Sequence, residues 1–271
     1  MEFKFSLSQL FNLTSPQFIL ITKLNFSNFK PTSNLKEVLA NLGKASQMAQ
    51  QIPSPLTDLE HIINNDQNVI LAVTPSNVCG YIKVGIKHLF QYLNSDVKEI
   101  LAFCILDFYV SEKVQRGGVG ISLLKQVQSI YNINIIDYAV DRPSQKMQKF
   151  GAKHLQWRNL VDQNTKFSQN PAAIKRLSEK FDKVRFEQKR KGKELDIHMG
   201  IEQYIGLIDG KQTGIEQQQW NQEIQQGNTL DKHQEINVEQ DIEEQIINEY
   251  IQQKQVNKLL GQKEYQQTGF W

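Results

Sequence analysis

The sequence predicts an α/β protein in which a sheet flanked by helices occupies residues 1–167, followed by a polar, partly helical and largely unpacked tail over residues 168–271. Two observations lead to this prediction. Short apolar runs alternate with segments of helical periodicity up to about Lys166, which favours an α/β sheet. Beyond that point Gln, Glu, Lys and Asn dominate, which is typical of a segment with too few apolar residues to bury a core.

The first elements expected along the chain are a strand and a long helix. Residues 3–7 alternate between apolar and polar side chains, as in a half-buried strand. Apolar residues recur at helical spacing over 35–49, and either Ser33 or Asn34 is placed to cap the start of that helix. Pro53 lies just beyond the helix and favours its termination there.

The next elements build the sheet and its crossovers. Residues 68–74 and 78–86 indicate two strands joined by a Pro-Ser-Asn turn. Lys98–Val110 contains an unbroken apolar run, which indicates a central strand buried on both faces. The pattern then predicts a helix over 120–131, a strand over 133–140 and a helix opened by Pro143.

Composition and charge exclude several classes of protein. A formal net charge of +2 gives no support to nucleic-acid binding. Cys79 and Cys104 form neither a disulfide framework nor a zinc-ligand spacing, so we expect a reducing compartment and no metal. The apolar runs are too short to span a bilayer and the N-terminus does not resemble a secretory leader. We therefore expect a soluble intracellular protein without membrane partners.

The segment Gln115–Gly120 (QRGGVG) fits an anion site between the central strand and an apolar helix. Glycines let main-chain N–H groups approach an anion, and a helix beginning near Gly120 directs its positive end toward it. Arg116 can add a charge-assisted hydrogen bond. Glycines alone also fit an ordinary strand-to-helix turn. The spacing differs from Walker and Rossmann patterns and is similar to the CoA pyrophosphate loop of the GNAT acetyltransferase superfamily.

Several segments together resemble the α-tubulin N-acetyltransferase family of that superfamily. They are Leu42–Ser46, Gly80–Gly85, His88–Phe90, Cys104–Val110, Val114–Gly120 and Asp141–Lys146. The likeness extends over residues 1 to about 167. It implies a GNAT-like fold with a mixed, splayed central sheet. It also implies transfer of acetyl from acetyl-CoA to a lysine of α-tubulin on the lumenal side of cytoplasmic microtubules, including those of cilia.

The resemblance also implies the site. The implied catalytic residues are Gln50, Cys104 and Asp141. The implied CoA-binding residues are Phe108, Tyr109, Val110, Gln115, Arg116, Gly117, Gly118, Val119, Gly120, Ile121, Ser144, Gln145, Lys146, Lys149 and Lys153. Because tubulin is acidic, a basic groove would speed the encounter. The candidates to line that groove are Lys83, Lys87, His88, Arg116 and Arg142, which also fit ordinary surface positions.

A lysine acceptor sets the chemical requirement at the site. Its pKa is about 10.4, so only about one amine in 10³ is neutral near pH 7 and a group must take its proton. Asp141 ends an apolar strand and suits that role, although its position also suits an N-cap of the next helix. Cys104 also fits a small buried hydrophobe; we expect it to assist proton removal in direct transfer rather than to form an acyl-enzyme. Gln50 can orient the substrate or be a solvated helix residue.

Two further sets of polar residues have alternative interpretations. Asp107 should lie on the strand face opposite Cys104, because side chains alternate, and should pair or line the site. A stripe of lysines at helical spacing can meet the CoA phosphates or form a solvated face: Lys146, Lys149 and Lys153. Lys183–Lys193 can contact a polymer surface or be a solvated helix.

Two departures from the family pattern keep alternatives open. Ser168–Pro171 should interrupt the closing strand that begins near Asp162–Phe167. Gly151 and Ala152 replace bulkier residues, which should weaken the packing beneath CoA. The alternatives are a GNAT enzyme for another amine, or a catalytically impaired microtubule-binding protein.

Overall fold

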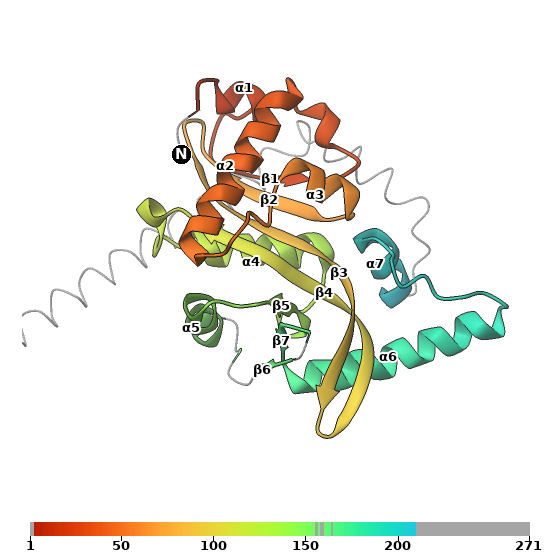
Figure 1. Ribbon diagram of the computed structural model, residues 1–271. Helices are drawn as coiled ribbons and strands as arrows, with labels where there is room; N and C mark the ends of the chain where they lie inside the picture. Colours follow the sequence, from red (N-terminus) through yellow and green to blue (C-terminus); the bar gives the residue numbers. More distant parts are fainter. Residues whose placement is uncertain (1–2, 155–156, 158–159, 164, 210–271) are drawn as a thin grey trace, which may run out of the picture. The chain divides into compact units, whose positions relative to one another are not determined.

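The computed structural model describes residues 3–154, 157, 160–163 and 165–209. Its centre is a seven-stranded sheet of order β1-β2-β3-β4-β5-β7-β6 (Figure 1). The strands are β1 Gln17–Ile21, β2 Asn68–Val73, β3 Val78–Leu93, β4 Asp96–Val110, β5 Ala139–Asp141, β6 Val161–Asp162 and β7 Phe167–Gln169. Only the β4–β5 pair is parallel, so the predicted mixed sheet is confirmed.

Helices cover both faces of the sheet. On one face, the apolar side of α2 (Thr32–Gln50) packs with Val69 and Leu71 of β2, beside α1 (Leu7–Phe11) and α3 (Leu59–Asn64). On the other face, α4 (Val119–Tyr131) packs against Ile70 of β2 and Ile82 of β3. The alternation of Val69, Ile70 and Leu71 between the two cores follows the period of two in a strand. The expected long helix, hairpin, central strand and crossover helix are therefore all present.

A β-bulge in β4 changes which face one predicted residue occupies. Lys83 of β3 lies opposite Asp107, but the next residue, Val84, lies opposite Ile105, so Leu106 has no partner in the register. An extra residue reverses the alternation beyond it. Asp107 therefore shares a face with Cys104, and the prediction that the two face opposite sides is wrong.

Three other local predictions are also wrong: the first strand, the cap of the long helix and the length of the strand over 133–140. No strand forms over residues 3–7, because the Ser6 hydroxyl accepts a hydrogen bond from the Gln9 amide (3.2 Å) and starts α1. α2 begins after Pro31, and neither Ser33 nor Asn34 caps it. The strand expected over 133–140 shortens to β5, since a 3-10 turn, η3 (Ile135–Asp137), precedes it.

The closing strand forms although its sequence is polar. Ser168 and Gln169 extend β7 instead of interrupting it, and both are buried. Gln169 accepts a hydrogen bond from Gln91 Nε2 (3.2 Å) and donates one to the carbonyl of Asp137 (3.1 Å). Pro171 then occupies the first turn of α6 (Pro171–Arg190). The prediction is therefore wrong for Ser168 and Gln169, which stay in the strand because buried polar groups are tolerated once hydrogen-bonded. It is correct that the strand ends within Ser168–Pro171, since Asn170 caps α6, which follows directly in place of an apolar strand.

The packed unit continues past the boundary predicted at residue 167. α6 and α7 (Ile201–Asp209) belong to the same compact unit as the sheet. Leu177 and Phe181 of α6 and Tyr204 of α7 are buried, and the Tyr204 hydroxyl donates to the carbonyl of Leu101 (3.2 Å). The remainder of the predicted tail, residues 210–271, lies outside the described residues. Within the described part of the chain, no helix combines the length and apolar character needed to cross a membrane.

Candidate active site

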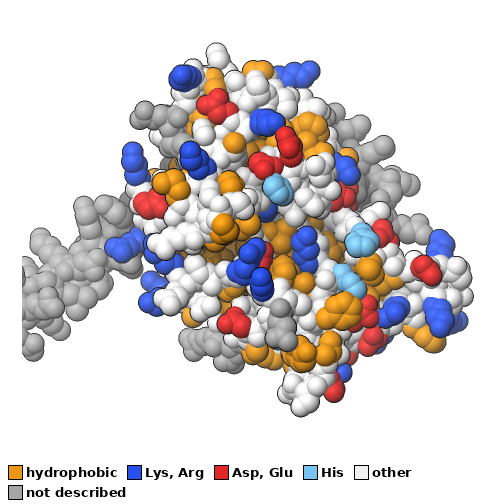
Figure 2. All heavy atoms as spheres, in the orientation of Figure 1, with side chains coloured by type: hydrophobic (Ala, Val, Ile, Leu, Met, Phe, Trp, Pro, Cys, Tyr) orange, Lys and Arg blue, Asp and Glu red, His pale blue; other side chains and the backbone are white. Residues whose placement is uncertain are grey.

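The candidate site lies where two parallel strands separate. β4 and β5 pair only at Cys104 with Ala139 and at Ile105 with Val140, and β4 then runs on to Val110. The next helices of the chain, α4 and α5 (Gln145–His154), begin on either side of this gap. In Figure 2 this face of the molecule is hollowed, with hydrophobic side chains in the floor and Lys and Arg side chains beside them. The gap is the place where both strands carry predicted catalytic residues, Cys104 on β4 and Asp141 on β5.

The predicted anion loop has the backbone that its glycines allow. Gly118 has a φ of +84°, and a Cβ added there would meet nothing within 4 Å. Gly118 is the N-cap of α4 and makes no side-chain cap, so the first-turn amides keep their capacity for an anion. Arg116 is exposed, with a φ of +67°. The Gln115 amide instead closes the loop by donating to the carbonyl of Val110 (2.8 Å).

Close packing brings β4, α4 and α5 together around this loop. A Cβ on Gly120 would lie 3.2 Å from Phe108 Cζ and 3.4 Å from Phe150 Cζ. The two phenylalanine rings are themselves 5.8 Å apart. The predicted cofactor residues Val110, Val119 and Ile121 are partly buried beside them. Tyr109 differs, because its side chain lies on the α2 face and its hydroxyl donates to Glu112 Oε2 (2.9 Å).

α5 carries the second predicted cofactor segment. The Ser144 hydroxyl accepts from the Met147 amide (3.2 Å) and so caps the start of this helix. The segment's polar side chains are exposed: Gln145, Lys146, Lys149 and Lys153. A Cβ on Gly151 would lie 2.0 Å from the buried Trp157 ring. The small residue therefore makes room for an indole, and the expected weak packing at Gly151 is wrong.

Asp141 ends β5 beside the gap and does not cap the next helix. Its side chain is 17% exposed, and both carboxylate oxygens accept hydrogen bonds from Arg142, at 2.9 Å from Nε and 3.2 Å from the second nitrogen. This contact raises the pKa of Arg142. Ser144 takes the capping role that was the alternative for Asp141. The carboxylate is therefore accessible from the gap and held by a guanidinium.

Cys104 lies under the gap as a fully buried thiol. Its Sγ donates to the carbonyl of Ala102 (3.3 Å) and has no exposed surface. Burial raises the pKa of the Cys104 thiol far above its ordinary value; nearby Lys87 opposes this rise and Asp141 adds to it. The thiol is therefore neutral near pH 7. The strand register places Lys87 and Asp141 close to it, because Cys104 lies opposite Gly85 of β3 and Ala139 of β5, each two residues away from them.

Lys83 is a buried lysine on the same face. It is 4% exposed, and its ammonium donates to the carbonyl of Leu56. Burial lowers the pKa of Lys83 to about 8, and Asp107 opposes this shift. Lys83 is therefore not the surface lysine that a basic groove needs. His88 also differs from that prediction, because it pairs with Glu99 (2.8 Å) and stacks on Phe181 of α6.

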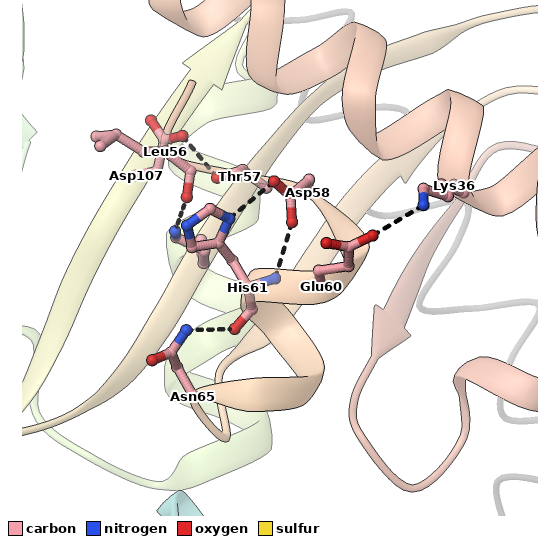
Figure 3. Close-up of polar contacts among 9 residues, drawn as sticks. Lys36, Leu56, Thr57, Asp58, Glu60, His61, Asn65 and Asp107 are labelled. Atoms are coloured by element: carbon pink, nitrogen blue, oxygen red, sulfur yellow. Dashed lines mark hydrogen bonds and ion pairs between the residues drawn. The ribbon is translucent and has the colours of Figure 1, made fainter. Parts of the chain in front are cut away.

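Gln50 joins a buried hydrogen-bond network centred on Asp107. The Gln50 amide nitrogen lies 2.9 Å from Asp107 Oδ1 and 2.7 Å from Ser46 Oγ, and Ser46 donates to the same carboxylate oxygen (2.8 Å). Thr57, in the loop before α3, donates to Asp107 Oδ2 (2.7 Å; Figure 3), and the Tyr81 hydroxyl donates to the same atom. The Gln50 side chain is therefore fixed by hydrogen bonds to Ser46 and Asp107, and the interpretation as a solvated helix glutamine is wrong.

Sequence reasoning gave no role to Ser46, Thr57 or Tyr81. Ser46 and Gln50 are four residues apart in a helix, so a shared face was readable from the sequence. Thr57 lies in a loop and Tyr81 in an apolar strand, and neither position carries a local signal. Their convergence depends on the bulge that turns Asp107 toward α2.

Outside the gap, the part of the chain that the structure describes contains a cavity but no metal-binding group. A cavity of about 310 Å³ opens between the end of α4, η3, α6 and α7, and none of the predicted site residues line it. Among the described residues, no group of three or more His, Cys, Asp or Glu side chains is arranged to hold a metal ion.

Comparisons of the sequence with known proteins identify its family. A family model described as "GNAT acetyltransferase, Mec-17" matches residues 3–202. An "Alpha-tubulin N-acetyltransferase" of Giardia intestinalis is 33% identical over 193 residues, covering 70% of this chain and 53% of that protein. A protein of the same name from Aedes aegypti is 34% identical over 128 residues, covering 45% of this chain and 47% of that protein.

The chain thus spans about half the length of these two curated relatives. Among solved structures, the xEco2 acetyltransferase domain matches with a TM-score of 0.38 and 10% identity, over 58% of this chain and 93% of that one.

Proposed function

We propose, because the chain belongs to the Mec-17 family of GNAT acetyltransferases, that it transfers an acetyl group from acetyl-CoA to a lysine side chain of α-tubulin. The names of its relatives support tubulin as the acceptor. The observation that carries the proposal is the start of α4 at Gly118, where no side chain hydrogen-bonds to the first-turn amides, beside the gap between β4 and β5. Action on the lumenal side of microtubules, an influence on their stability, and a place on cytoplasmic and ciliary microtubules belong to the same proposal.

The residues at the start of α4 fit the pyrophosphate of CoA. Gly118 leaves open space beside amides that no side chain caps, and exposed Arg116 adds a positive charge. The exposed lysines of α5 suit the outer phosphate of the same molecule: Lys146, Lys149 and Lys153. When bound, acetyl-CoA supplies the acetyl group as a thioester. The chain's own task is then to orient and deprotonate the amine.

Asp141 is the group we assign to the proton of the acceptor lysine. Its carboxylate is partly exposed at the gap, and Arg142 holds both oxygens in place. A lysine ammonium that replaces the Arg142 contact can pass its proton to the carboxylate. The neutral amine then attacks the thioester carbonyl directly within a ternary complex. The amide C–N bond forms as the C–S bond breaks, and the second proton of the amine goes to the departing CoA thiolate.

Cys104 does not form a covalent intermediate in this proposal. Its sulfur is fully buried, and burial keeps the pKa of the thiol so high that it stays protonated near pH 7. A thiol is a poor nucleophile in that state. Its burial supports direct transfer, with Cys104 packed under the reacting groups and Asp141 as the main proton acceptor.

The test is acetylation of polymerised tubulin by the full chain, followed by mass spectrometry of α-tubulin lysines. We expect acetyl-CoA-dependent modification that falls by about 10² or more in Asp141→Asn, because one proton acceptor contributes roughly that factor. The matched control is Asp182→Asn, an exposed aspartate of α6, which should keep full activity. Equal activity in Asp141→Asn and wild type would refute the assignment.

Two other outcomes identify the alternatives. Binding of CoA, measured by calorimetry, without modification of tubulin but with acetylation of another amine indicates a GNAT enzyme for a different acceptor. Pelleting with microtubules without any CoA binding indicates a microtubule-binding protein that has lost activity.

A further inference from the structure

Asp107 is a buried carboxylate that accepts hydrogen bonds from five donors. It is 5% exposed and accepts from the side chains of Ser46, Gln50, Thr57 and Tyr81 and from the Phe108 amide. The donors come from α2, from the loop before α3 and from two strands. The Asp107 side chain therefore links β4 by hydrogen bonds to α2, to the loop before α3 and to β3.

The chemistry of this network fixes the orientation of Gln50. Every other contact of the Asp107 carboxylate comes from a donor, and Gln50 likewise faces it with its NH₂, which can only donate. Ser46 donates its own proton to Asp107, so it too accepts from the Gln50 nitrogen. Both acceptors thus select the same amide orientation. No donor among the described residues reaches Gln50 Oε1, which is left to accept from elsewhere.

We infer that Asp107 is a positioning residue that anchors the Gln50 amide so that its oxygen can receive the ammonium of the acceptor lysine. This inference rests on the proposed function for the identity of the acceptor. The anchoring itself rests on geometry alone. Ser46 and Gln50 share one face of the last turns of α2, and the bulge at Leu106 turns Asp107 toward that face.

The anchoring is tested without any turnover by NMR of the side-chain amides. The Gln50 NH₂ signal, assigned by its loss in Gln50→Ala, should be displaced from those of exposed glutamines and should exchange more slowly with water. In Asp107→Asn, it should move to the position of exposed glutamines. A Gln50 signal unchanged in Asp107→Asn would overturn the inference, whether or not the protein acetylates tubulin.

The effect on catalysis is tested by a double-mutant cycle. Asp107→Asn should lower kcat about 10- to 100-fold and leave KM for acetyl-CoA within about twofold, because a misplaced group acts mainly on the reacting geometry. If Asp107 acts through Gln50, the double variant Gln50→Ala with Asp107→Asn should be no slower than the slower single variant. Multiplied effects in the double variant would overturn the inference.

Two further variants separate positioning from folding. Ser46→Ala keeps the carboxylate but removes one of the two acceptors of Gln50, and should lower kcat about 3- to 10-fold. The control is Tyr131→Phe, which removes a buried hydroxyl that accepts from Asn68 (2.9 Å) on the other face of the sheet. Both variants should lower Tm by a few degrees. A kcat loss in Tyr131→Phe equal to that in Ser46→Ala would overturn the inference.

Discussion

Replacing Gly43, in the middle of α2, would change stability through two opposing effects, helix propensity and a steric clash. In an isolated helix, Gly43→Ala should stabilise by about 1 kcal/mol, because alanine has the better helix propensity. Here a Cβ on Gly43 would lie 2.0 Å from the carbonyl oxygen of Thr57 and 3.1 Å from its carbonyl carbon. The obstacle is backbone, so either α2 or the loop must move by roughly 1.4 Å to reach an ordinary contact of about 3.4 Å.

The cost of the clash should exceed the gain in helix propensity. Forcing a methyl group into packed backbone costs about 1–3 kcal/mol, and this contact lies at the upper end. Displacing Thr57 also loosens its hydrogen bond to buried Asp107, which costs about 1–3 kcal/mol more. After the helix gain is subtracted, Gly43→Ala should lower the free energy of unfolding by about 3–5 kcal/mol and should also lower kcat.

Urea unfolding at pH 7, followed by circular dichroism, measures this change directly. The control is Lys44→Ala, the next residue of α2, which is exposed and should change stability by less than about 0.5 kcal/mol. A Gly43→Ala protein as stable as wild type, or more stable, would refute the claim that the loop holding Thr57 is fixed against α2.

Three further predictions concern the buried lysine, the anion loop and α6. Burial lowers the pKa of Lys83 from 10.5 to about 8, so the unfolded chain binds more protons between these pH values and stability should rise with pH there, by about 3 kcal/mol at most. Lys83→Met should flatten that rise in urea unfolding from pH 7.5 to 10; an unchanged slope would count against the buried ammonium. Gly118→Ala must hold a left-handed φ and should weaken CoA binding in calorimetry about five- to tenfold, through a strain of about 1 kcal/mol; equal affinity would contradict the anion site. Phe181→Ala should lose about 3–5 kcal/mol in the same unfolding assay, whereas an unaffected protein would show that α6 is not part of the core.

The order of elements was readable because it depends on local patterns. The apolar run within Lys98–Val110 predicts β4, and the glycine turn followed by periodic apolar residues predicts α4. Strand and helix periods act over a few residues, so one segment carries enough information. The apolar run before Asp141 similarly placed this residue at the end of a strand, where the structure has it.

The errors share a physical cause in contacts between distant residues. β7 forms from polar residues because Gln169 finds partners in Gln91 and Asp137, which lie in other parts of the chain. The composition of α6 is polar, yet one face of the helix, which includes Leu177 and Phe181, is buried and packs it against the sheet. Composition averages over such a stripe, so it placed the boundary of the packed unit too early.

The sequence by itself determined the α/β order, the glycine turn before α4 and the carboxylate at the end of β5, since each is encoded in adjacent residues. Only the tertiary structure decided the environment of Gln50 and Asp107. One unpaired residue, Leu106, reverses the strand face, and the side-chain partners of Asp107 come from three other segments of the chain. Local periodicity contains no information about such an insertion or about which distant hydroxyls will meet a carboxylate, because both are set by how the elements pack together.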